Sequence, residues 1–315
     1  MTSHFDRRAI PPGLSIGEWR AADGWPLRRF DWEPAGGETR GSILFQAGRG
    51  DFIEKYLEVY AHWRGQGWRV SGFDWRGQGG SGRLLADRRV GHLPSLDPLL
   101  RDFTGFAAEW LAESPAPHVL IGHSMGGHLA LRLLAERGIA VDAAILVAPM
   151  LGLNTGPVPV RIARALARAL CALGLTERPA WREGNRPGEA EHTRQTNLTA
   201  CLDRYADELW WKGEHPELAL ATPSWGWLVA AFESIAGLDR PGVMEKVTTP
   251  MLILGSEHDR LVSPAAISKA AARLPNARLV MSKQGAHELL REVDGVRLPL
   301  LAEIDRFLDA KAARR

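Results

Sequence analysis

The chain has only two cysteines among its 315 residues, Cys171 and Cys201, and both lie in sequence with a helical pattern. Two cysteines so placed predict neither a disulfide framework nor a zinc site. No stretch reaches the roughly 18 consecutive apolar residues that a membrane-spanning helix needs. Residues 1–8 lack the apolar segment of a signal peptide. We therefore expect a cytoplasmic protein, with contact at a membrane surface left open.

The sequence also lacks a strong charge of either sign. Its formal net charge is +2, so no global field favours nucleic acid, and we expect no nucleic-acid partner. Hydrophobic residues make up 45% and charged residues 24% of the chain, as in ordinary soluble globular proteins. A chain of this length can bury a complete central sheet.

What the sequence does contain is an alternation of strand and helix patterns. Short apolar runs between turn residues predict strands, and apolar residues at three- and four-residue spacing predict helices. Such alternation favours an α/β fold, with a mostly parallel central sheet flanked by helices. The predicted strands span residues 27–32, 41–46, 68–74, 118–121, 143–148, 251–255 and 277–281, and the predicted helices include 52–65, 97–113 and 298–308.

The alternation is interrupted once. Residues 151–240 show helical patterns, no strand pattern and five tryptophans. Strand patterns return after residue 250. We therefore predict a core formed by residues 1–150 and 241–315, with residues 151–240 inserted between its two halves as a helical lid. Because the core sequence resumes after it, the lid is not an independent domain.

Residues 122–126, Gly-His-Ser-Met-Gly, carry the strongest functional signal. They follow an apolar run and precede a helical pattern. A strand, the motif G-x-S-x-G and a helix together make the arrangement known as a nucleophile elbow. Glycines two places either side of the serine let the strand and the helix pass close to it. The pattern predicts Ser124 as a nucleophile.

A serine hydroxyl needs a general base within hydrogen-bond reach and a carboxylate that orients the base. After a nucleophile elbow these partners follow in the order acid, then histidine, each on a loop behind a later strand. Asp259 and His287 occupy those two places. We therefore predict a catalytic triad of Ser124, His287 and Asp259.

Two further carboxylates lie next to the predicted acid and base. Glu257 is the rival acid, because it shares the loop of Asp259. Glu288 directly follows His287, and we expect it to point away from the base into solvent.

A tetrahedral intermediate carries an oxyanion, which needs preorganised N–H donors. One predicted donor is the backbone N–H of Met125, the residue after the nucleophile. The second is the backbone N–H of Arg49, in the loop of residues 47–51 behind an early strand. The alternative is that this loop is a plain surface turn.

Residues 77–82, Gly-Gln-Gly-Gly-Ser-Gly, contain the motif G-x-G-x-x-G. In a dinucleotide-binding fold this motif opens directly into a helix, and an acidic residue follows about 20 positions later on the next strand. Here an irregular segment follows instead. We therefore favour a tight loop beside the active site, braced by Asp74 and Arg76.

With these features the chain resembles members of the α/β-hydrolase superfamily. Within that superfamily it resembles the group of monoglyceride lipases and bacterial lysophospholipases L2 (hydrolase-4, serine aminopeptidase S33 type). The resemblance rests on residues 73–83, 122–127, 259–262 and 285–288. It is weakest in the predicted lid. Relatives usually have His-Gly where this chain has Ala47 followed by glycine, and Asp-His-Arg-Gly where it has Trp75 in place of the histidine.

The resemblance implies a serine carboxylic ester hydrolase for lipid-like substrates, a lysophospholipase or monoacylglycerol lipase, that works without a cofactor. A small-molecule carboxylesterase, an aminopeptidase and an acyltransferase would share the triad, and a non-catalytic binding module would share the fold. The head group, the acyl-chain length and the oligomeric state stay open.

Residues 158–173 within the lid predict a basic amphipathic helix, with Arg161, Arg164 and Arg168 on one face. The favoured interpretation packs the apolar side of this helix on the core and leaves the arginines in water. The alternative is peripheral contact with an anionic membrane surface.

Overall fold

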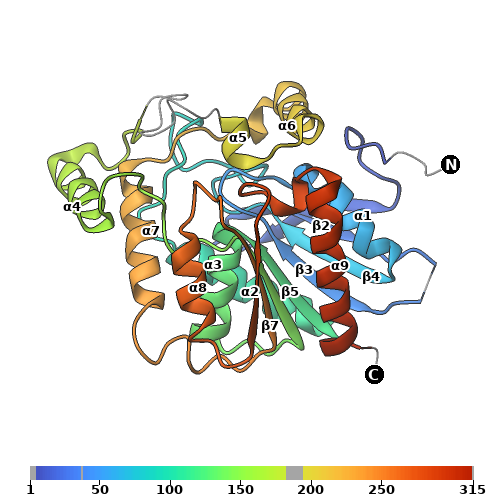
Figure 1. Ribbon diagram of the computed structural model, residues 1–315. Helices are drawn as coiled ribbons and strands as arrows, with labels where there is room; N and C mark the ends of the chain where they lie inside the picture. The colour runs from blue at the N-terminus through green and yellow to red at the C-terminus, as the bar shows by residue number, and fades with distance from the viewer. Residues whose placement is uncertain (1–4, 37, 182–193, 314–315) are drawn as a thin grey trace.

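The computed structural model describes residues 5–36, 38–181 and 194–313. Its centre is a sheet with the strand order β1-β2-β4-β3-β5-β6-β7-β8 (Figure 1). The six strands from β4 to β8 along this order are parallel, and β1 and β2 add an antiparallel edge. The predicted α/β class and mostly parallel sheet are confirmed. The strands are β1 (Leu14–Arg20), β2 (Pro26–Trp32), β3 (Gly41–Gln46), β4 (Trp68–Phe73), β5 (His118–His123), β6 (Ala143–Val147), β7 (Met251–Ser256) and β8 (Ala277–Ser282).

Helices cover both faces of this sheet. One face packs against α2 (Asp97–Glu113), α3 (Met125–Arg132) and α8 (Pro264–Ala271), and the other against α1 (Leu57–Gly65) and α9 (Asp294–Lys311). Every residue of β3, β6 and β7 is buried. Burial on both faces explains why these strands are apolar runs without alternation.

A helical segment, residues 148–250, lies between β6 and β7, which are neighbours in the sheet; we call this segment the insert. Its described helices are α4 (Val160–Leu170), α5 (Arg194–Leu198), α6 (Leu202–Glu214) and α7 (Trp225–Leu238), and its residues 182–193 lie outside the description. Trp227, Ala231 and Leu238 of α7 join the core. In Figure 1, α4 and α6 lie at the same end of the molecule.

The exposed side of α4 corrects the favoured interpretation of residues 158–173. Ile162 and Leu166 of α4 are 58% and 51% exposed, and Leu173, in the short π-helical segment Cys171–Leu175 that follows α4, is 75% exposed. Arg164 and Arg168 instead form ion pairs with a carboxylate of α7. The small side chain of Ala167 is completely buried, so alanine, not the large apolar residues, forms the packed side. No helix among the described residues is long and apolar enough to cross a membrane.

Strand β1 is absent from the sequence prediction. Among its seven residues only Leu14 is buried, Trp19 is partly buried against the core, and the other five are exposed. An edge strand of this kind carries no run or alternation of apolar residues from which it could be recognised.

Candidate active site

Ser124 sits at a sharp turn between β5 and α3. Its backbone has φ 53° and ψ −115°, a conformation that residues with side chains rarely adopt. A Cβ atom on Gly126 would lie 2.2 Å from the backbone oxygen of Gln46, and one on Gly122 would lie 2.6 Å from that of Gly126. The turn therefore requires glycine at both positions, as the nucleophile-elbow motif predicts.

The three side chains of the predicted triad come together from distant parts of the chain. Nε2 of His287 lies 2.9 Å from Oγ of Ser124, and Nδ1 of His287 lies 2.7 Å from Oδ2 of Asp259. The other carboxylate oxygen of Asp259 accepts the backbone N–H groups of Leu261 and Val262, at 2.8 and 2.9 Å. These bonds fix the carboxylate, which in turn fixes the orientation of the imidazole.

Asp259, not Glu257, faces the imidazole. Asp259 and His287 are 4% and 3% exposed, whereas Glu257 lies in solvent. Burial by itself would lower the pKa of His287, but the charge and hydrogen bond of Asp259 outweigh it and raise that pKa above its ordinary value. Burial would raise the pKa of Asp259, but the imidazole and the two backbone N–H groups outweigh this and lower it.

The loop behind β3 runs directly beside the serine. A Cβ atom on Gly48 would lie 3.1 Å from that of Ser124. The N–H of Gly48 donates to Oδ2 of Asp51 at 2.8 Å, which holds the turn in place next to Arg49. Met125 begins α3, and the first N–H groups of a helix have no partner within it. The assignment of the backbone N–H groups of Arg49 and Met125 as oxyanion donors remains a prediction.

The glycine-rich segment 77–82 supports this loop. Oε1 of Gln78 accepts the N–H of Gly50 at 2.6 Å, and Asp74 accepts the N–H of Gly80 at 2.8 Å. Arg76 forms an ion pair with a carboxylate of α2. The segment is the tight loop that the sequence predicts, and the next helix begins only at α2.

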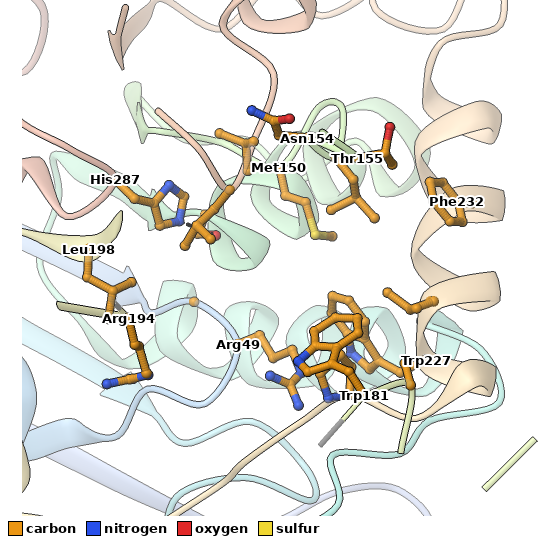
Figure 2. A pocket seen from close by; sticks show the side chains of 18 of the residues that line it. Arg49, Met150, Asn154, Thr155, Trp181, Arg194, Leu198, Trp227, Phe232 and His287 are labelled. Atoms are coloured by element: carbon orange, nitrogen blue, oxygen red, sulfur yellow. Dashed lines mark hydrogen bonds between the residues drawn. The ribbon is translucent and has the colours of Figure 1, made fainter. Parts of the chain in front are cut away.

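A pocket of about 340 Å³ opens at Ser124 and His287. Figure 2 shows its two unlike sides. Arg194 and Leu198 lie on the side of His287, and Trp181, Trp227 and Phe232 lie on the opposite side. The guanidinium of Arg49 lies over the ring of Trp227, 5.2 Å from its centre, and donates to a backbone carbonyl of the insert. Further apolar lining comes from Met150, Leu153, Val158, Ala163, Leu166, Trp225, Leu228, Leu261 and Val262.

A buried group of charges adjoins the polar side of the pocket, and the sequence analysis missed it. Nζ of Lys55 contacts Asp51, Glu208 of α6 and Glu288, and Arg291 pairs with Glu208 and Glu288. The expectation that Glu288 is solvated is wrong, because it is 2% exposed and lies between two cations. The sequence offers no signal for this group, because Lys55 lies off the apolar face predicted for the helix of residues 52–65 and has the pattern of a solvated charge.

Comparison with known proteins gives the family. Residues 37–294 match the model of the Hydrolase_4 family, described as serine aminopeptidase, S33. The chain belongs to this family. It is 29% identical to a probable lysophospholipase L2 of Haemophilus influenzae over 87% of this chain and 85% of that protein. It is 28% identical to lysophospholipase L2 of Escherichia coli over 84% of this chain and 79% of the relative.

The fold is shared with solved structures. A soluble variant of monoglyceride lipase from Saccharomyces cerevisiae superposes with a TM-score of 0.76 at 18% identity, over 98% of this chain and 99% of that one. The fold and the family make the protein an enzyme, a serine hydrolase of the α/β-hydrolase fold that is related to lysophospholipases and monoglyceride lipases.

Proposed function

We propose that this Hydrolase_4 enzyme hydrolyses carboxylic esters of single-chain lipids, as a lysophospholipase or monoacylglycerol lipase, with Ser124, His287 and Asp259 as its catalytic triad. The observation that carries the proposal is the chain of two contacts, 2.9 Å from the hydroxyl to the imidazole and 2.7 Å from the imidazole to the carboxylate.

The reaction has two steps. In the first, Nε2 of His287 takes the proton of the Ser124 hydroxyl while the oxygen attacks the ester carbonyl, and the same proton then leaves with the alcohol. In the second, water loses a proton to His287 and attacks the acyl-serine, and His287 then returns the proton to the oxygen of Ser124 as the fatty acid leaves. Asp259 holds the tautomer of the neutral imidazole and stabilises the imidazolium that forms in each step.

In this mechanism the backbone N–H groups of Arg49 and Met125 bind the oxyanion of both tetrahedral intermediates. Two features support the assignment: the loop that contains Arg49 passes beside Ser124, and Met125 stands at the N-terminus of α3. Donors fixed by the fold need no reorganisation when the charge develops, which makes them effective in a site of this kind.

The shape of the pocket supports an acyl chain as the group transferred to the serine. Trp181, Trp227 and Phe232 line the side that faces away from His287, and Trp225 lines the same pocket. Burial of each methylene of a fatty chain there contributes about 0.8 kcal/mol. The leaving alcohol then occupies the polar side, near Arg194.

The exposed side of α4 supports a site of action at a membrane surface, on the cytoplasmic side. Ile162 of α4 and Leu173 in the segment that directly follows it are largely exposed, and Arg161 of α4 is exposed as well. Apolar side chains flanked by arginines bind anionic lipid interfaces. Because Leu166 and Ala163 of α4 line the pocket, a lipid that leaves the membrane along α4 reaches the serine directly; α4 thus acts as part of a lid.

A substrate panel tests the proposal. The enzyme is given lysophosphatidylethanolamine, monooleoylglycerol, a short p-nitrophenyl ester and an aminoacyl p-nitroanilide, and Ser124→Ala serves as the control. We expect release of fatty acid from the two lipids and none by the variant. Preference for the anilide would support an aminopeptidase, preference for the short ester would support a small-molecule esterase, and wild-type protein without any hydrolysis would overturn the proposal.

A further inference from the structure

We propose that Arg194 binds the phosphate of the substrate's head group and so makes the site selective for lysophospholipids over uncharged monoacylglycerols. The inference rests on the proposed function, because it assigns the polar side of the same pocket to the leaving alcohol.

The position of Arg194 suits this role. It is the first residue of α5 in the insert and lines the pocket. Its side chain lies on the side of His287, opposite Trp181 and Trp227 (Figure 2). An ester that places its acyl chain among the tryptophans therefore directs its alcohol toward Arg194.

The guanidinium of Arg194 has N–H donors that no described residue is shown to accept. It donates to the hydroxyl of Tyr205 at 3.3 Å and to Oε1 of Glu208 at 2.7 Å, and its carbon lies 5.6 Å from the centre of the Tyr205 ring. Among the residues that the structure describes, these contacts fix the group and use two of its five N–H donors. The side chain is still 47% exposed, so its remaining donors are accessible from the pocket.

The surrounding charges favour an anion at this place. Among the described residues, Arg194 belongs to a network of seven charged side chains joined by ion pairs. Four of them are cations and three are anions, so the network has a formal charge of +1 when histidine is counted as neutral. Arg194 is its most exposed member, and each of the others is at most 15% exposed. The network consists of Asp51, Lys55, Glu208, Lys212, Glu288, Arg291 and Arg194.

The excess positive charge of this network is therefore exposed to the substrate at Arg194. A planar guanidinium forms paired hydrogen bonds with phosphate oxygens. The hydroxyl groups of an uncharged glycerol gain much less from the same cation, which is the physical basis of the selectivity.

The experiment compares two substrates with the same acyl chain, oleoyl lysophosphatidylethanolamine and monooleoylglycerol. The readout is the ratio of their kcat/KM values. In Arg194→Gln we expect this ratio to fall about tenfold, the effect of one charge-assisted hydrogen bond. Arg194→Lys, which keeps the charge, should retain most of the ratio. Arg178→Gln is the matched control, because it removes an exposed arginine of the insert that does not line the pocket.

A soluble probe separates head-group binding from binding to lipid aggregates. We expect sn-glycero-3-phosphoethanolamine to inhibit hydrolysis of a short p-nitrophenyl ester by the wild-type enzyme, with an inhibition constant about tenfold higher in Arg194→Gln. An unchanged substrate ratio in Arg194→Gln, or wild-type enzyme that the probe does not inhibit, would overturn the assignment of Arg194. Either result leaves the proposed ester hydrolysis standing, whereas loss of all hydrolysis in wild type would count against the proposed function itself.

Discussion

Nζ of Lys55 contacts Oε1 of Glu288, the residue that directly follows His287. The same ammonium donates to Oδ1 of Asp51 at 2.5 Å, and Asp51 holds the N–H of Gly48 beside the serine. One buried cation thus connects the loop next to the nucleophile with the loop that carries the base.

Replacement of Lys55 by methionine should destabilise the fold strongly. The change leaves buried carboxylates without their shared cation, and the loss of one partner from a buried ion pair costs about 3–5 kcal/mol. Urea denaturation measures the free energy of unfolding. Lys269→Met is the control, because its pair with Asp239 is exposed and contributes less than about 1 kcal/mol. Equal effects in the two variants would contradict a structural role for the buried cation.

Substitution of Asp259 by asparagine should lower kcat by roughly 10³–10⁴-fold, the size expected when the acid of such a triad becomes an amide. The pH profile should change as well. The base must be neutral, so activity is lost as the pH falls through the pKa of His287. In the wild type that pKa is raised above 6.5, the ordinary value for histidine. We therefore expect the acid limb of the kcat/KM profile above pH 6.5.

Without the carboxylate of Asp259, the largest influence that opposes burial is lost, although the charges of Glu288 and Asp51 still raise the pKa of His287. The acid limb should therefore move to lower pH in Asp259→Asn. Glu257→Gln is the control and should leave both the rate and the limb in place, since that side chain lies in solvent. If the acid limb shifts in Glu257→Gln and does not shift in Asp259→Asn, then Glu257 and not Asp259 is the acid of the triad.

Alanine at Gly126 should disrupt the turn that presents Ser124. The new Cβ would meet the backbone oxygens of Gln46 and Ala47 at 2.2 and 2.5 Å, and backbone atoms cannot rotate away. We expect a loss of about 1–3 kcal/mol or more, together with loss of activity. Gly295→Ala in α9 meets no atom within 4 Å and should be neutral or slightly stabilising. A stable, fully active Gly126→Ala variant would show that the turn tolerates a side chain.

Replacement of both Ile162 and Leu173 by glutamate should weaken binding to anionic vesicles. The two native side chains are exposed and apolar and would insert into the lipid interface, which the glutamates would not do. Cosedimentation with vesicles measures the binding, and hydrolysis of a soluble p-nitrophenyl ester should remain close to wild type. Leu298→Glu on α9 provides the control, since this residue is 49% exposed on a helix of the core. Vesicle binding that is unaffected in the double variant would rule out α4 and the segment Cys171–Leu175 as the contact.

The sequence predicted those parts of the molecule whose pattern is local. The nucleophile elbow and the buried strands β3, β5, β6 and β7 are continuous stretches, and their residue types follow from a tight turn or from burial on two faces. The positions of Asp259 and His287 could be predicted because parallel strands bring their following loops to one edge of the sheet.

The parts that could not be predicted depend on contacts between distant segments. Glu288 and Lys55 are 233 positions apart, and each alone has the pattern of a solvated charge. In α4 the sequence shows which residues are apolar, but not that the helix packs through Ala167. Arg194 carries no motif, and only the folded pocket brings it near His287 (Figure 2).

The most direct test of the central claim is covalent labelling of the wild-type enzyme with a fluorophosphonate, followed by mass spectrometry of its peptides. We expect one adduct, on Ser124, that forms rapidly in wild type, slowly in His287→Ala and not at all in Ser124→Ala. An unlabelled wild-type enzyme, or an adduct on another residue that forms at the same rate in Ser124→Ala, would contradict that claim.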